Sequence, residues 1–452
     1  MQHPIRAYLL IPILSLVAVS SSRGQADTAR LASDSGSARW TPMLLGTQMN
    51  FIHQRLIPFR APYDGPNSLQ HGGDAKTSEA YGAYAGIRIL KGLDSYLDVE
   101  MIRGRGISRT VGLAGITNGD VIRQGSADLG DGPYIARAFF RYTMGFDGPL
   151  DTLVKAPDQL PMVVGSNRVE ITLGKFALSD FFDVNRYANS TRTQFMNWGL
   201  FQNTAWDYAA DTRGYSNGVA LGWLHPWWSV RAAVMQMPSF ANGNKFDSGL
   251  DRAHGIQAEL TLRVPLTRSV VRALAFENDA RMGRYAVVLA SAGPAPPNIP
   301  SDDAPGRRKY GWGLNVEQPI ADEGETGAFL RYGWGDGATE TFVFTEVDRH
   351  LSGGFQLSGI HWNRRNDRFA VAAVQHGIVR VHQDYLAAGG NGFLLGDGRL
   401  SYGEELIVEA YYRMQIGPWV QLSPDYQFVQ NPGYNRERGP ASVVALRMNV
   451  RY

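Results

Sequence analysis

The sequence predicts an all-β protein, a transmembrane antiparallel β-barrel of about 16 strands with inward-folded loops. Three observations lead to this prediction. The chain begins with a segment typical of secretion, no later apolar stretch is long enough for a membrane helix, and apolar and polar residues alternate in segments of about ten residues. A chain with the first two features crosses a bilayer only if its strands close into a barrel, and the third feature supplies those strands.

The N-terminus has the pattern of a secretory signal peptide. A basic start precedes an apolar run from Ala7 to Val19, and small residues lead to an expected cleavage site after Ala26. Because the run is short and contains Pro12, it does not suit a membrane anchor, which needs about 20 apolar residues. We expect a signal peptide over residues 1–26, a short N-terminal segment over 27–40 and the barrel over 41–452.

Composition agrees with a large barrel and excludes other classes of protein. The 452 residues include 51 glycines, 20 tyrosines, 20 phenylalanines and 10 tryptophans, which suit tight turns and aromatic girdles at the lipid interface. There is no cysteine, so the chain has neither a disulfide framework nor thiolate chemistry. A net charge of +2 gives no support to nucleic-acid binding. We expect no cofactor and no nucleic-acid partner.

Period-two alternation gives each expected strand one apolar and one polar face. In one example the apolar and the polar residues are, respectively, Ile256, Ala258, Leu260 and Leu262, and Gln257, Glu259, Thr261 and Arg263. Arginine and glutamate at mid-strand suit a watery lumen better than the core of a soluble sandwich. The segments are also longer than the usual strands of such a sandwich.

About 16 such segments are found, an even number in the range of barrels with an aqueous channel. They start near residues 41, 78, 95, 133, 168, 215, 228, 254, 269, 309, 328, 351, 368, 404, 419 and 442. Leu224–Trp227 and Gly417–Pro418 are expected as periplasmic turns, and 104–132, 177–214, 291–308 and 377–403 as external or inward-folded loops. The last strand ends at Tyr452, as expected of a signal for outer-membrane assembly machinery.

One motif suggests enzyme chemistry but lacks its context. Gly214–Gly218 matches the G-x-S-x-G elbow of hydrolases, which needs a strand before it and a helix after it. Here Val219, Leu221 and Trp223 alternate as a strand instead. We therefore expect no enzymatic activity.

The stretch from Gly174 to Tyr215 is unusually rich in aromatic, amide and charged residues for a solvent loop. Such residues suit a plug or constriction, where aromatic faces stack on sugar rings and polar groups hydrogen-bond to hydroxyls. The alternative is a loop that only braces the barrel wall.

This stretch resembles the carbohydrate-selective porin family, in which a G-K-F…D-F-F-D…R-T-Q-F-M-N-W…W-D-Y-x-A-D-T-R-G-Y run is typical. The matching residues are Gly174–Phe176, Asp180–Asp183, Arg192–Trp198 and Trp206–Tyr215. The resemblance extends to Pro66–Leu69, Tyr96–Glu100, Gly104–Gly106 and Thr117–Gly125 and covers nearly the whole mature chain. It implies a monomeric barrel of sixteen strands in the outer membrane, with a narrowed channel for passive uptake of glucose and related sugars.

The resemblance also implies which residues form the constriction. By motif position these are Asp98, Glu100, Arg103, Arg192, Asp207, Asp211 and Arg213, to which we add Asn197 and Trp206 from the same stretch. Expected partners are small neutral sugars, outer-membrane lipid and lipopolysaccharide, and the barrel-assembly machinery.

Alternation predicts a lumen of mixed charge, which favours neutral or zwitterionic solutes. The inward residues are Arg88, Arg137, Arg141, Arg331 and Arg413, against Asp98, Glu100, Glu259, Glu317 and Glu409. Two alternatives remain. A branch of the family is labelled manganese-selective, and a Mn²⁺ porin needs Asp98, Glu100, Asp207 and Asp211 to converge without paired arginines. An outer-membrane enzyme or adhesive barrel is the other.

Overall fold

The computed structural model describes residues 44–121, 129–343 and 345–452. The expected signal peptide, the segment 27–40 and the first residues of the expected barrel, 41–43, lie outside the described residues.

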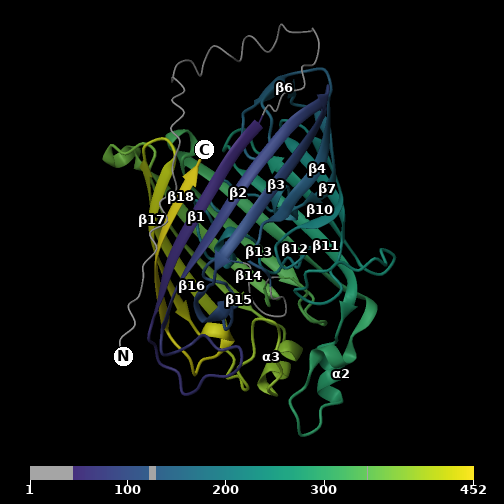
Figure 1. Cartoon of the computed structure of the whole chain (residues 1–452), viewed down its shortest axis with the longest axis vertical. Helices are drawn as coiled ribbons and strands as arrows, with labels where there is room; N and C mark the ends of the chain where they lie inside the picture. The colour runs from purple at the N-terminus through teal and green to yellow at the C-terminus, as the bar shows by residue number, and fades with distance from the viewer. Residues whose placement is uncertain (1–43, 122–128, 344) are drawn as a thin grey trace, which may run out of the picture. The chain divides into compact units, whose positions relative to one another are not determined.

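The described residues form a closed barrel of sixteen antiparallel strands, in which each strand pairs with its neighbour (Figure 1). β1 pairs with β18, from Gln48 opposite Arg451 to Ile57 opposite Ser442, so the sheet has no free edge. The predicted all-β class and the predicted barrel are therefore confirmed. The barrel strands are β1 (Leu44–Ile57), β2 (Asp74–Leu90), β3 (Leu93–Gly104), β4 (Tyr134–Gly145), β7 (Arg168–Phe176), β8 (Ser216–Leu224), β9 (Trp228–Gln236), β10 (His254–Arg263), β11 (Val270–Met282), β12 (Ala304–Ala321), β13 (Thr326–Gly335), β14 (Arg349–Ser358), β15 (Arg368–Gly377), β16 (Glu405–Ile416), β17 (Val420–Gln430) and β18 (Ala441–Arg451).

A separate two-stranded sheet, β5 (Leu150–Leu153) and β6 (Met162–Gly165), lies between β4 and β7 in the sequence. The α-helices of the described part of the chain are short: α1 (Trp198–Phe201), α2 (Tyr285–Ala290) and α3 (Arg380–Ala387). Within that part, no helix is long and apolar enough to cross a membrane.

Each predicted strand start lies within a few residues of a barrel strand. The largest difference is at β12, which begins at Ala304 and not near 309, so the expected loop 291–308 is wrong at its end. Pro305, Gly306 and the consecutive arginines at 307 and 308 hide the alternation in the sequence. They nevertheless belong to the strand, since Arg307 pairs with Ala280 of β11.

The apolar faces of the strands point outward and the polar faces point into the barrel. In β10, Ile256, Leu260 and Leu262 are each more than 40% exposed, whereas Glu259 and Thr261 are 2% exposed. The inside is therefore the wet, polar side, as the alternation predicts, and the outer surface is apolar enough for lipid.

The two ends of the barrel differ. The long connections, which include α2 and α3, lie at one end, and the C-terminus and the short turns lie at the other (Figure 1). The expected turns after β8 and β16 lie at the end with the C-terminus. The other end has the expected loops 177–214 and 377–403 and the described residues of the expected loop 104–132. Outer-membrane barrels have short periplasmic turns and long extracellular loops, so we expect the short-turn end to face the periplasm.

A charge on the lipid-facing surface will destabilise the barrel strongly. Leu260→Arg puts a guanidinium in the middle of β10, where Leu260 is 42% exposed on the outer face. We expect a cost of about 2–4 kcal/mol in the free energy of unfolding, measured by denaturant unfolding in lipid vesicles. The matched control is Leu266→Arg in the turn after β10, where the side chain is 94% exposed and the cost is at most about 1 kcal/mol.

Candidate functional site

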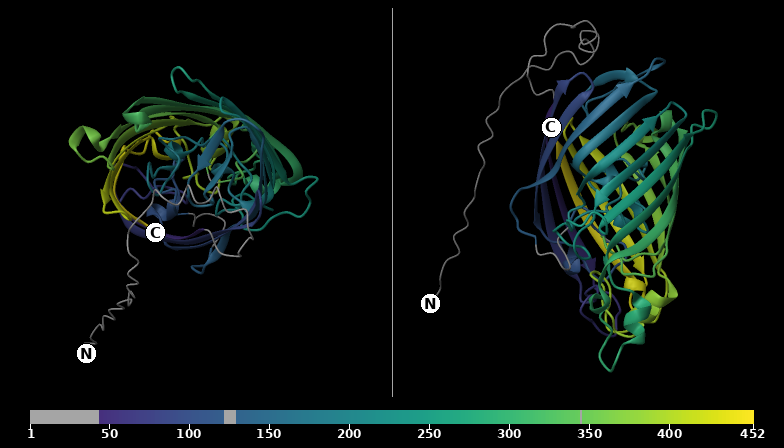
Figure 2. Two further views of the ribbon diagram at one scale, coloured as in Figure 1. Left: turned by 90° about the horizontal axis from the view of Figure 1, so that it is seen from above. Right: turned by 90° about the vertical axis from the view of Figure 1, so that its right-hand side faces the viewer.

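The loop between β7 and β8, residues 177–215, folds into the barrel and is called the plug loop below. Figure 2 (left) shows segments of chain crossing inside the ring of strands. The plug loop is fastened to the wall made by β12–β16. Arg331 of β13 is fully buried and donates hydrogen bonds to the carbonyl oxygens of Asp183, Ala188 and Leu200, at 3.0, 2.7 and 3.1 Å. It also ion-pairs with the Asp183 carboxylate at 3.2 Å.

Two further acid groups fasten the plug loop. Glu409 of β16 accepts hydrogen bonds from the backbone N–H groups of Met196 and Asn197, at 2.6 and 2.9 Å. Asp207 of the loop ion-pairs with Lys309 of β12 at 3.3 Å, with both side chains almost completely buried. Burial raises the pKa of Asp207, although Lys309 acts to lower it. These contacts hold the loop against one side of the barrel.

A cavity of about 570 Å³ lies between the plug loop and the opposite wall, which is built by β1–β4 and β7–β9. Segment 119–120, from the loop after β3, and the tip of the β5–β6 hairpin also line it. The cavity is open to solvent. Its volume is in the range typical of ligand-binding sites, so it has room for a small polar molecule.

Arg192 crosses this cavity from the plug loop to the wall. Its guanidinium lies 3.0 Å from Glu100 of β3 and donates a hydrogen bond to Asp120 at 2.7 Å. Asp120 is held in turn by the amide of Asn50, at 2.7 Å. Burial lowers the pKa of Arg192, but the two carboxylates outweigh it and hold that pKa well above its usual range. Arg192 is therefore a fixed cation at this point.

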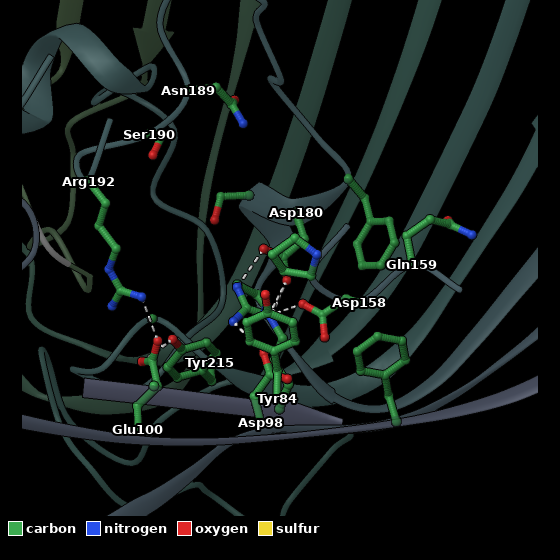
Figure 3. Close-up of a pocket in the computed structure, with 18 of the residues that line it drawn as sticks. Tyr84, Asp98, Glu100, Asp158, Gln159, Asp180, Asn189, Ser190, Arg192 and Tyr215 are labelled. Carbon is green, nitrogen blue, oxygen red and sulfur yellow. Dashed lines mark hydrogen bonds and ion pairs between the residues drawn. The ribbon is translucent and has the colours of Figure 1, made fainter. Parts of the chain in front are cut away.

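Arg137 of β4 lies at the centre of a second charged cluster, with Asp98, Asp158 and Asp180, three acid groups that are labelled in Figure 3. Its guanidinium lies 2.7 Å from Asp180 of the plug loop, 3.2 Å from Asp98 of β3 and 3.4 Å from Asp158 of the hairpin. Burial raises the pKa of Asp158, although Arg137 acts to lower it. Three acid groups from different elements thus converge on one guanidinium.

Aromatic rings stand beside these charges. The hydroxyl groups of Tyr215 and Tyr134 donate to Glu100 at 2.7 and 3.0 Å. The Arg213 guanidinium lies over the Tyr134 ring, 4.3 Å from its centre. Tyr215 lines the cavity, and so do the rings of Tyr84, Phe139, Phe181, Trp198, Phe201 and Tyr208. The cavity thus combines flat apolar faces with paired donors and acceptors.

The family comparison identifies the kind of barrel. The model of the carbohydrate-selective porin, OprB family matches residues 84–452. The chain belongs to this family. Family and fold together point to an outer-membrane channel rather than an enzyme.

Solved structures are similar to this porin to different degrees, and one of them has the same fold. OprB of Pseudomonas putida, in its high pH structure, has a TM-score of 0.65 at 14% identity, over 91% of this chain and 94% of that chain. OmpF of Salmonella typhi in complex with daunomycin has a TM-score of 0.46 at 12% identity, over 90% of this chain and 97% of that chain. The channel DcaP of Acinetobacter baumannii has a TM-score of 0.45 at 10% identity, over 90% and 96% of the two chains. No curated protein matches the sequence.

The structure brings together four of the nine predicted site residues in this porin. Asp98, Glu100, Arg192 and Arg213 line the cavity. Four others are buried in the plug loop and do not line it, and these are Asn197, Trp206, Asp207 and Asp211. Asn197 donates to Gln427 at 3.0 Å, and Asp211 accepts from the backbone N–H groups of Arg213 and Tyr215. Burial raises the pKa of Asp211, which lies 3.8 Å from Lys175.

The placement of Arg103 at the constriction is wrong. Glu100 and Ile102 of β3 are buried on the inner face, whereas Arg103 is exposed on the outer face and pairs in register with Glu79 of β2. Its position is an odd number of residues from Asp98 and from Glu100 in a strand of period two, which places it on the opposite face.

Sequence reasoning about the constriction missed Arg137, Asp158 and Asp180. Alternation placed Arg137 in the lumen, and its side chain does lie there, but nothing in the sequence links it to two distant loops. Asp158 lies at the tip of a hairpin that was not predicted.

The hydrolase-like motif has a structural role. Ser216 opens β8, is fully buried and donates a hydrogen bond to the carbonyl oxygen of Gln236 at 2.6 Å. No helix follows it within the described residues of this segment, and the elbow geometry that would expose a nucleophile is not formed.

Proposed function

We propose that this porin conducts small neutral sugars of the size of glucose into the periplasm by passive diffusion. The observation that carries the proposal is the near-neutral, aromatic-lined cavity between the plug loop and the wall. Among the described residues, its lining holds six arginines, 137, 141, 168, 192, 213 and 231, and six acid residues, 98, 100, 120, 158, 170 and 180.

Such a lining suits a molecule with many hydroxyl groups. Each hydroxyl donates to a carboxylate and accepts from a guanidinium, so adjacent hydroxyls match ion pairs such as Arg192 with Glu100. The aromatic rings offer apolar faces to the C–H faces of a sugar ring. Both kinds of contact replace contacts with water, so the net free energy of binding is small. A channel needs such weak binding because the solute must be able to leave again.

A neutral solute fits this lining better than Mn²⁺. The acid groups that a manganese porin would need are each close to a cation. Asp98 lies near Arg137, Glu100 near Arg192, Asp207 near Lys309 and Asp211 near Lys175. No cluster of three potential metal ligands is found among the described residues. A sugar needs no such cluster, whereas Mn²⁺ prefers several oxygen ligands together.

Glucose will reduce the ionic current through single channels in planar bilayers. A sugar that occupies the cavity displaces ions, so the current is expected to fall with glucose concentration and to saturate, with a half-saturation in the millimolar range typical of weak binding, roughly −4 kcal/mol. Liposome swelling with glucose and Mn²⁺ flux under the same conditions provide the second measurement. A current that glucose leaves unchanged, together with rapid Mn²⁺ entry, would contradict the proposal.

A further inference from the structure

The β5–β6 hairpin is an unusual feature of the periplasmic end. The other connections at that end, within the described residues, are short turns over 91–92, 225–227, 264–269, 322–325, 359–367 and 417–419. The connection from β4 to β7 instead runs over 146–167 and contains a two-stranded sheet that is not part of the barrel. Figure 1 shows β6 at the same end of the barrel as the C-terminus.

The tip of this hairpin reaches the cavity. Leu153, Pro157, Asp158 and Gln159 are among the lining residues. Arg141 of β4 donates a hydrogen bond to the carbonyl oxygen of Asp158 at 2.9 Å. Leu160 is fully buried, and its N–H donates to the hydroxyl of Tyr96 of β3 at 3.1 Å. The tip is therefore docked on the barrel wall and forms part of the lining of the cavity.

The hairpin also brings carboxylates to the arginines of this end. Asp158 lies 3.4 Å from Arg137, and Asp151 at the base of the hairpin lies 3.0 Å from Arg168. Arg137, Arg141 and Arg168 all line the cavity. Arg137 keeps Asp98 and Asp180, and Arg168 keeps Glu170, when the hairpin is absent. The hairpin nevertheless carries two carboxylates and only one cation, Lys155, so its removal makes the charge of the periplasmic mouth more positive, which attracts anions.

The hairpin can be removed without changing the strands of the barrel. Strands of four residues in a two-stranded sheet have little stability of their own, so the hairpin depends on its contacts with the wall. At its base, the N–H of Ser166 donates to the carbonyl oxygen of Pro149 at 2.8 Å. The chain ends left by removing residues 150–165 therefore already meet.

We propose that the hairpin over residues 150–165 is the exit filter of this channel. It narrows the periplasmic mouth, and its Asp151 and Asp158 carboxylates offset the arginines there, so neutral sugars leave readily and anionic sugar acids do not gain a preferred path. This inference rests on the proposed function for its solutes and on the geometry of the hairpin for its mechanism.

Two variants test the filter. The first lacks residues 150–165, and the second is Asp151→Asn/Asp158→Asn, which keeps the hairpin and removes its carboxylates. The matched control is Asp147→Asn, since Asp147 is exposed in the same connection and does not line the cavity. Folding of each variant is checked by β-type circular dichroism and by heat-dependent gel mobility.

The readouts are single-channel conductance, the reversal potential in a KCl gradient, and the influx of glucose and of gluconate into liposomes. We expect the deletion to raise conductance and to raise the anion-to-cation permeability ratio by at least about fivefold, the effect of one unit charge close to the path. The double variant raises the same ratio and the influx of gluconate relative to glucose. Asp147→Asn changes neither.

A double variant that folds and keeps the permeability ratio of the unmodified chain overturns the filter, whether or not the deletion folds. Failure of the proposed function is a different result. In that case the unmodified chain conducts KCl but admits no glucose, while the KCl ratio still reports on the hairpin.

Discussion

Replacing Arg192 with alanine will raise the cation-to-anion permeability ratio of the channel roughly tenfold relative to the unmodified chain. Arg192 lies between Glu100 and Asp120 and joins the plug loop to the wall. Without it, two carboxylates face the cavity with no cation between them. A unit charge about 4 Å from the path of an ion changes its energy by about 1 kcal/mol in water and about 4 kcal/mol near a protein surface.

The reversal potential in a KCl gradient measures this change. The matched control is Arg103→Ala, the same substitution on the outer face of β3, for which we expect no change in selectivity. Arg192→Lys separates charge from geometry. It keeps the cation but loses the planar fork, so selectivity stays near that of the unmodified chain while the glucose effect on the current weakens. Equal shifts in the Arg192→Ala and Arg103→Ala variants would contradict this account.

Replacing Arg331 with alanine will release the plug loop and cost about 3–5 kcal/mol in the free energy of unfolding. The buried guanidinium is bonded to three carbonyl groups of the plug loop and to the Asp183 carboxylate. Its removal leaves Asp183 buried without its cation, although Asp183 still accepts hydrogen bonds from Asn203 and Asn315. We also expect higher conductance, because the loop no longer stays against the wall.

Denaturant unfolding, conductance and limited proteolysis of residues 177–215 check this prediction. Arg186→Ala is the control in the same loop. Arg186 ion-pairs with Glu325 at 3.0 Å, but both side chains are about 40% exposed. An exposed pair of this kind contributes about 0–1 kcal/mol. A plug loop that resists protease in the Arg331→Ala variant as it does in the unmodified chain would show that Arg331 does not hold it.

The strands were predictable because each has one physical requirement repeated along its length. Ile256, Leu260 and Leu262 must meet lipid, and Gln257 and Glu259 must not, so period two is visible in the sequence. The β5–β6 hairpin shows no such periodic pattern in the sequence. Its strands contain four residues each, too few to show a period, and their environment comes from contacts with β3 and β4.

The plug loop was predictable as an element, but the roles of its side chains were not. Composition marked 177–215 as more than a solvent loop, yet no periodicity shows which side chains meet the wall and which meet the cavity. Asp207 and Arg192 belong to the same charged stretch, and one is buried against Lys309 while the other crosses the cavity. The error at Arg103 has the opposite origin, since motif position was followed where strand parity already gave the answer.

Cysteine substitution tests most directly whether solutes pass through the cavity between the plug loop and the opposite wall, where β1–β4 lie. The chain has no cysteine of its own, so one introduced thiol reports on one place. Ser190 lines the cavity, and Ser301 is exposed in an extracellular loop away from it. We predict that a water-soluble thiol reagent of sugar size lowers the single-channel current of Ser190→Cys, that glucose slows this reaction, and that modified Ser301→Cys conducts as before. Full current through Ser190→Cys after complete modification would contradict the account.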